Sequence, residues 1–157
     1  MKPAAIFALI GLAALAGAAS AQQAASPAND IVATRKAGFA MSAVTVNSIN
    51  AGIEAKAPLA SQGFTVGALR KWAHAIPGAF PAGTSATDLP GATMAKPEIW
   101  TDRAGFEAKA ADYAAAVDKL AELTQGTDTE AFEDQFAVVR AACGSCHNPY
   151  RIERPRG

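Results

Sequence analysis

A short cysteine motif near the C-terminus constrains this chain more than any other feature. It reads Cys143-Gly144-Ser145-Cys146-His147, and its two cysteines are the only ones in the sequence. The pattern C-x-x-C-H is typical of covalent c-type haem attachment, in which the thiols bind the haem vinyl groups and the imidazole coordinates iron. On a helix, Cys143 and His147 share a face and Cys146 lies beside both. The motif therefore predicts one haem c bound through Cys143 and Cys146, with His147 as axial iron ligand.

The same spacing has three other interpretations: a redox pair, a local disulfide, or half of a zinc site. A thioredoxin-type redox pair requires a βαβ context, which the sequence does not show. A zinc site requires about four ligands, and the one other histidine is His74. A Cys143–Cys146 disulfide in a haem-free bundle stays open, because an exported protein encounters an oxidising compartment.

The N-terminus predicts export. Lys2 supplies a positive start, residues 4–18 form an apolar run, and Ala19-Ser20-Ala21 forms an A-x-A cleavage site. The apolar run is short for a membrane span, although a retained anchor is the alternative. We expect residues 1–21 to be a secretory signal peptide and residues 22–157 to be one mature domain in the periplasm.

Charge and composition exclude some classes of protein. The chain carries 14 basic and 14 acidic residues, and no basic patch suitable for nucleic acid is visible. The sequence also shows no acid–base pair or nucleophile that would indicate an enzyme. Aromatic residues make up 7% of the chain, and its abundant alanine favours helix over sheet.

Apolar periodicity predicts an all-α fold. Four helices are expected at about 29–55, 61–75, 101–125 and from 127 into the haem motif. The third is expected to start at Thr101 or Asp102. The fourth is expected to start at Thr127 or Asp128, where Thr127 with Glu130 would form a capping box. A Pro- and Gly-rich segment, 76–100, separates the second and third helices, and the other connections are short. This pattern predicts an antiparallel four-helix bundle with a long crossover loop between helices 2 and 3.

The last predicted helix leads directly into the haem motif. Its apolar positions are spaced by four, three, four, three and four residues, at Phe132, Phe136, Val139, Cys143, Cys146 and Tyr150. The haem cysteines therefore belong to the core face of that helix.

At this point the chain resembles the cytochrome c′ family, the class II c-type cytochromes. The resemblance rests on Cys-x-x-Cys-His-x-x-Tyr-Arg at 143–151, on Lys-Pro-Glu-Ile-Trp at 96–100, and on Arg35 in the first helix. It implies a left-handed four-helix bundle with haem between the helices near one end. It also implies binding of NO and CO, electron transfer with a redox partner that the sequence does not identify, and a homodimer formed through the first two helices.

The resemblance places a distal position four residues after Arg35. Relatives with Met at that position tend to be six-coordinate, low-spin electron carriers, whereas this chain has Phe39, whose ring cannot ligate iron. We therefore expect five-coordinate, high-spin iron under an apolar distal face of Phe39, Val46 and Phe80, which favours NO and CO over O₂.

A six-coordinate electron carrier with a methionine ligand is the alternative. Met41 lies about 200° around the helix from Phe39, so it is expected to face away from the iron. Met94 in the crossover loop is the other candidate, and His74 is interpreted as a polar residue at a helix terminus.

The resemblance also assigns the remaining site residues. Arg35 is expected to bind a haem propionate and Tyr150 to pack on the haem edge. Arg151, four residues after His147, is expected on the same side of the helix; a proximal gas pocket and a salt bridge or propionate contact stay open as its roles. Pro149 disfavours helix at Asn148, so we expect the last turn to kink or end there.

Overall fold

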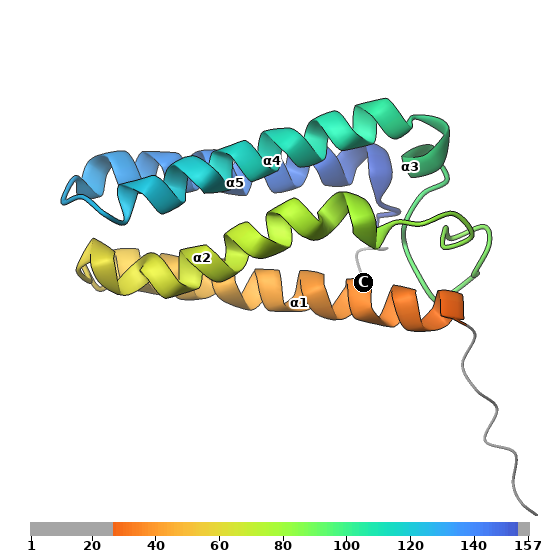
Figure 1. The fold of residues 1–157 in the computed structure, drawn as a ribbon, viewed down its shortest axis with the longest axis horizontal. Coiled ribbons are helices and arrows are strands. Elements are labelled where there is room, and N and C mark those ends of the chain that lie inside the picture. The colour runs from red at the N-terminus through yellow and green to blue at the C-terminus, as the bar shows by residue number, and fades with distance from the viewer. Residues whose placement is uncertain (1–26, 154–157) are drawn as a thin grey trace, which may run out of the picture.

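The computed structural model describes residues 27–153, and the predicted signal peptide lies outside them. Its elements are α1 (Pro27–Glu54), α2 (Leu59–Ala75), the 3₁₀ helix η1 (Ile76–Ala79), α3 (Glu98–Thr101), α4 (Arg103–Leu123) and α5 (Thr129–Tyr150). Figure 1 shows α1 and α2 side by side along one side of the molecule and α4 and α5 along the other. The predicted all-α four-helix bundle is confirmed.

The long crossover joins α2 to α4 at one end of the bundle (Figure 1). It contains more regular secondary structure than its proline and glycine content suggested, because it begins with η1 and ends with α3. The backbone N–H of Ala86 donates to the Ala95 carbonyl at 2.8 Å, which closes the loop on itself. The crossover is therefore a folded segment, and it lies at the end of the bundle where α5 carries the haem motif.

Aspartate side chains cap the N-termini of α4 and α5. Asp102, one of the two predicted starts of its helix, accepts a hydrogen bond from the Gly105 N–H at 3.2 Å, and Asp128 accepts one from the Ala131 N–H at 3.0 Å. Of the two predicted starts of the last helix, Asp128 is the N-cap of α5, and the capping box of Thr127 with Glu130 does not form. Each carboxylate satisfies an N–H group that has no partner within its helix.

Helix bounds differ from the predictions by a few residues. α1 begins at Pro27, two residues before the predicted start, and α2 begins at Leu59, directly after Pro58. Proline suits the start of a helix because its φ is fixed near helical values and it has no N–H to leave unpaired.

Of the two outcomes predicted at Pro149, a kink or an end of the last turn, the helix end lies one residue after Pro149. α5 continues through Pro149 to Tyr150. Pro149 is the penultimate residue of the helix, so its missing N–H removes one bond close to the helix end. The final turn then closes through the Arg151 N–H, which donates to the His147 carbonyl at 2.9 Å.

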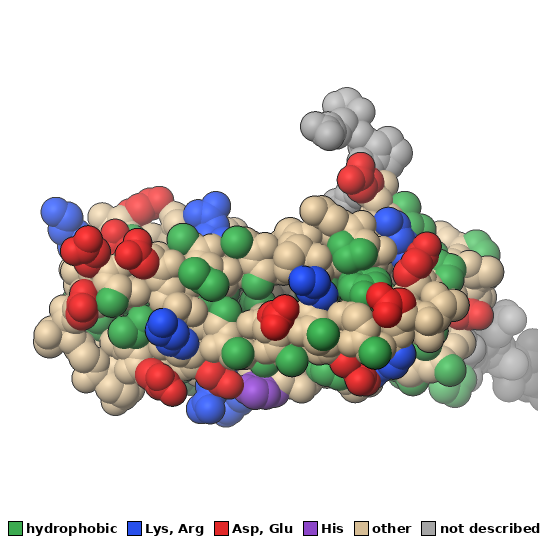
Figure 2. Space-filling model, turned by 90° about the horizontal axis from the view of Figure 1, so that it is seen from above, with side chains coloured by type: hydrophobic (Ala, Val, Ile, Leu, Met, Phe, Trp, Pro, Cys, Tyr) green, Lys and Arg blue, Asp and Glu red, His purple; other side chains and the backbone are tan. Residues whose placement is uncertain are grey.

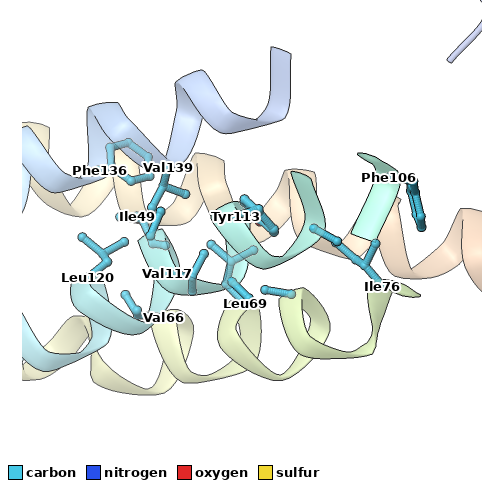
Figure 3. Packing of buried hydrophobic residues seen from close by; sticks show 14 of the residues in the cluster. Ile49, Val66, Leu69, Ile76, Phe106, Tyr113, Val117, Leu120, Phe136 and Val139 are labelled. Carbon is cyan, nitrogen blue, oxygen red and sulfur yellow. The ribbon is translucent and has the colours of Figure 1, made fainter. Parts of the chain in front are cut away.

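The hydrophobic core lies between the four long helices. Figure 3 shows buried side chains from all four helices pointing toward one another. At most 1% of the surface of Ile49, Val66, Leu69, Val117, Leu120 and Val139 is exposed. α1 contributes only Val32, Arg35 and Ile49 to the buried set. α1 packs chiefly on α2, and toward the crossover a cavity separates it from α4 and α5.

The surface carries charges of both signs. On the face shown in Figure 2, acidic and basic side chains are interspersed and form no large patch of one sign. Within residues 27–153, every helix is too short or too polar to cross a membrane.

Candidate haem site

A cavity of about 670 Å³ opens between α1, the crossover, α4 and α5. This size lies within the range of about 300–1,000 Å³ that is usual for ligand and cofactor sites. Its lining is mostly apolar and includes Phe39, Ala43, Val46, Ile76, Phe80, Ile99, Phe106, Ala110, Tyr113 and Ala142.

The predicted haem motif lies on one wall of this cavity. Cys143, Cys146 and His147 all line it, and both cysteines are free thiols that are half-buried. Burial raises the pKa of the Cys143 and Cys146 thiols. Burial, and then the charge of Arg151, lowers the pKa of His147. Both causes favour the neutral imidazole, which is the form that coordinates a metal.

These residues fit a covalently bound haem. The cavity offers an apolar volume, two thiols for thioether bonds and one neutral imidazole, all on successive turns of α5. A zinc site fits less well, because residues 27–153 contain no group of three or more His, Cys, Asp or Glu side chains able to hold a metal ion.

Phe39 lines the same cavity as the predicted iron ligand His147, and their rings lie close together. The centroids of the Phe39 and His147 rings are 6.4 Å apart, with 65° between the ring planes. The Phe80 ring is 6.2 Å from the Phe39 ring, and Val46 lines the cavity on the same helix as Phe39. The three residues predicted for the distal face are thus brought to one cavity, and none of them offers a hydrogen-bond donor.

The structure separates the alternative iron ligands. Met41 is 64% exposed and does not line the cavity, in agreement with the helical geometry. Met94 lines the cavity. His74 lies outside it, and its Nε2 is 3.0 Å from the Asp118 Oδ1 on α4.

Arg35 is the most buried charged residue of the site. It is 3% exposed, and burial lowers the pKa of its guanidinium. Its Nη atoms donate to the Thr84 Oγ1 and carbonyl, to the Thr93 Oγ1 and to the Ala79 carbonyl, at 2.9–3.3 Å. The guanidinium carbon also lies 4.3 Å from the Phe80 ring centroid. Arg35 therefore lines the cavity and also anchors the crossover, and its predicted propionate contact stays a prediction.

Tyr150 and Arg151 close the end of the cavity. The Tyr150 hydroxyl donates to the Asp102 Oδ2 at 2.7 Å. Arg151 is extended and pairs with Ala95 in an isolated antiparallel bridge, and the Ile152 N–H donates to the Met94 carbonyl at 2.8 Å. Arg151 still lines the cavity, but it is not on a helical face shared with His147, because the helix ends one residue earlier.

Three features of the site had no clear sequence signal. Thr84 and Thr93, which bind Arg35, lie in an irregular loop without periodicity. Lys109 of α4 also lines the cavity. Tyr113 was predicted in the apolar stripe of its helix, but its position at the haem cavity was not predicted. Burial is the main cause that raises the pKa of Tyr113 to about 12, and the nearby Cys143 adds to the shift.

An antiparallel helical bundle whose last helix carries C-x-x-C-H into an apolar cavity defines a bundle-type c-type haem protein. Comparison with known proteins then gives the family. The family model described as Cytochrome C' matches residues 30–151, and the chain belongs to the cytochrome c′ family. The prediction of one covalently bound haem c is confirmed by this membership.

Individual relatives cover nearly the whole chain. Cytochrome c' of Cereibacter sphaeroides is 30% identical over 146 residues, which span 91% of this chain and 97% of the relative. Cytochrome c' of Allochromatium vinosum is 29% identical over 144 residues, which span 91% and 94%.

Solved structures agree with the fold. Cytochrome c' from Rubrivivax gelatinosus matches with a TM-score of 0.70 and 28% identity, over 80% of this chain and 97% of that one. A mutant of cytochrome c prime from Alcaligenes xylosoxidans, solved as a nitric oxide complex, matches with a TM-score of 0.73 and 25% identity, over 83% and 99%.

Proposed function

We propose that this chain is a periplasmic haem protein with five-coordinate, high-spin iron that binds NO and CO and carries electrons. Cys143 and Cys146 hold the haem, and His147 is the single protein ligand of the iron. The observation that carries the proposal is the position of Phe39: this side chain, which has no lone pair to donate, lines the cavity with its ring centroid 6.4 Å from that of His147.

The chain's own residues would perform three tasks. His147 supplies a neutral ring nitrogen, because burial disfavours its protonated form. Phe39, Val46 and Phe80 exclude water and offer no hydrogen bond to a bound gas, so neutral NO and CO are favoured over O₂, which gains most from a donor. The haem supplies the iron that takes up a gas or an electron, and the protein sets access and polarity.

Gas binding is further supported by the relative from Alcaligenes xylosoxidans, whose structure contains nitric oxide. Arg35, Tyr150 and Arg151 would hold the edges of the haem. The two Arg side chains line the cavity with their cations, which suits the carboxylates of the propionates.

A second candidate function is electron transfer by six-coordinate iron with Met94 as the sixth ligand. It is favoured by one observation, that Met94 lines the cavity while Met41 does not. In this second function the Met94 sulfur would occupy the sixth coordination position of the iron, whereas in the first function that position is open to gas.

Titration of the ferrous holoprotein with CO separates the two functions. The full chain would be expressed with its export signal and the haem-attachment machinery, with Met94→Leu as the comparison variant. The first function predicts that CO binds stoichiometrically and at the same rate in both proteins. If CO binds only when Met94 is replaced, the second function is correct.

A further inference from the structure

We infer that Trp72 is the positioning residue of the distal face: it holds Phe39 over the iron and thereby sets how fast a diatomic gas can bind. The inference rests on the proposed function, in which Phe39 covers that face. Trp72 lies on α2, contacts the Phe39 ring and is not part of the cavity lining.

The contact between Trp72 and Phe39 is close and oriented. Their ring centroids are 5.1 Å apart with 88° between the planes. This edge-to-face arrangement is one of the two that aromatic quadrupoles favour. It is also the shortest ring contact of Phe39, since the centroids of Phe80 and His147 are 6.2 and 6.4 Å away.

Gly38, the residue before Phe39, makes room for the indole. A Cβ atom at Gly38 would lie 2.7 Å from Cζ2 of Trp72 and closer still to Cζ3 and Cη2. The six-membered ring of the indole therefore sits directly on the backbone of α1. Any side chain at position 38 would push the indole away from α1, and so away from Phe39.

Packing contacts, rather than a hydrogen bond, hold the indole in this position. The Trp72 Nε1 is buried and has no hydrogen-bond partner within residues 27–153, although a buried donor without a partner is unfavourable. The other tryptophan differs, because the Trp100 Nε1 donates to the Pro81 carbonyl at 3.0 Å. Trp72 thus contributes contact surface rather than a hydrogen bond.

These contacts restrict how Phe39 can move. Trp72 and Phe80 both contact its ring, and Arg35 lies over the Phe80 ring at 4.3 Å. A gas that approaches the iron opposite His147 must displace the Phe39 ring. The indole occupies space that the ring would need, so removing the indole should make that displacement easier.

The test is the rate of CO association with the ferrous holoprotein, measured by flash photolysis. We expect Trp72→Leu to raise this rate at least tenfold, with Trp72→Phe between it and the original protein. Leu69→Ala is the matched control, because it removes a buried α2 side chain that has no ring contact with Phe39, and it should leave the rate within about twofold. Phe39→Ala is the reference for a face that is fully uncovered.

A second pair of variants approaches the contact from α1. Gly38→Ala should also raise the rate, because its methyl group would displace the indole. In the double variant Gly38→Ala/Trp72→Phe, the smaller ring leaves room for the methyl group, so the rate should return to that of Trp72→Phe alone. This rescue would not follow if both changes only destabilised the helices.

The outcomes are distinguishable. If Phe39→Ala accelerates CO binding while the Trp72 and Gly38 variants do not, Trp72 has no positioning role and the inference is wrong, although Phe39 still covers the iron. If Phe39→Ala also leaves the rate unchanged, Phe39 does not cover the iron, and the proposed distal face fails together with the inference.

Discussion

Phe39 and methionine differ in the one respect that determines iron coordination, which is a lone pair able to bind the metal. The Phe39 ring lines the cavity close to His147, at 6.4 Å between centroids. The neighbouring Met41 is 64% exposed, because two residues along a helix turn a side chain by about 200°. A change at residue 39 should therefore alter coordination without altering the fold.

Phe39→Met tests this geometry. The methionine sulfur would enter the space opposite His147, and we expect most of the ferric protein to become low-spin and CO association to slow at least tenfold. Met41→Leu is the control, and it should leave both properties unchanged because Met41 is outside the cavity. The measurements are the electronic absorption spectrum and CO-binding kinetics; a spectrum of Phe39→Met that stays high-spin would show that residue 39 does not face the iron.

At the scale of helices, the end of α5 is fastened to the start of α4 beside the haem motif. The Tyr150 hydroxyl donates to Asp102, which also caps α4, and the backbone around Tyr150 pairs with the crossover at Lys96. The hydrogen bond to Asp102 is the first cause that raises the pKa of Tyr150 to about 12.

Tyr150→Phe should remove about 1.5 kcal/mol of stability at neutral pH, as is usual for a hydrogen bond to a charged group. In the original protein the contribution is complete below pH 10, where an unfolded tyrosine is still neutral, and it is lost as the pH rises from about 10 to 12. Urea unfolding of the holoprotein across this pH range measures both effects. Equal alkaline losses in the two proteins would contradict the assignment to Tyr150.

At the scale of the whole molecule, the cavity separates α1 from α4 and α5 toward the crossover end. α1 contributes only three buried residues along its 28-residue length. The haem is therefore expected to form much of the packing between the two halves of the bundle, so it should stabilise the fold as well as supply the iron.

Replacing both thiols, as Cys143→Ala/Cys146→Ala, prevents covalent attachment. We expect the melting temperature to fall by more than about 10 °C, because a group that binds only the folded chain stabilises it and each kcal/mol corresponds to a few degrees in a domain of this size. Differential scanning calorimetry measures the change. A haem-free protein as stable as the holoprotein would show that the cavity walls do not need the cofactor.

α1 and α2, the helices predicted to form the homodimer interface, carry exposed apolar side chains. Phe64 on α2 is 91% exposed, and Met41 and Val44 on α1 are 64% and 61% exposed. We expect the holoprotein to sediment as a dimer and Phe64→Asp to sediment as a monomer with an unchanged spectrum. A dimer that survives this substitution would exclude an interface through Phe64.

Much of the fold and the centre of the site could be predicted from sequence because they depend on local patterns. Helical periodicity placed Cys143 and Cys146 on the core face, and the angle between Phe39 and Met41 follows from helix geometry alone. The exact residue at which α5 ends could not be predicted, because the cost of the missing N–H of Pro149 depends on how close the helix end lies. The partners of Arg35 could not be predicted either, since Thr84 and Thr93 reach it only through the tertiary path of the crossover.

The most direct measurement of the central claim is the electron paramagnetic resonance spectrum of the ferric holoprotein at neutral pH. Iron bound by His147 and left without a sixth protein ligand under Phe39 predicts a dominant high-spin signal and no methionine–iron charge-transfer band in the matching absorption spectrum. A dominant low-spin signal with that band present would contradict the account and assign the sixth position to a methionine.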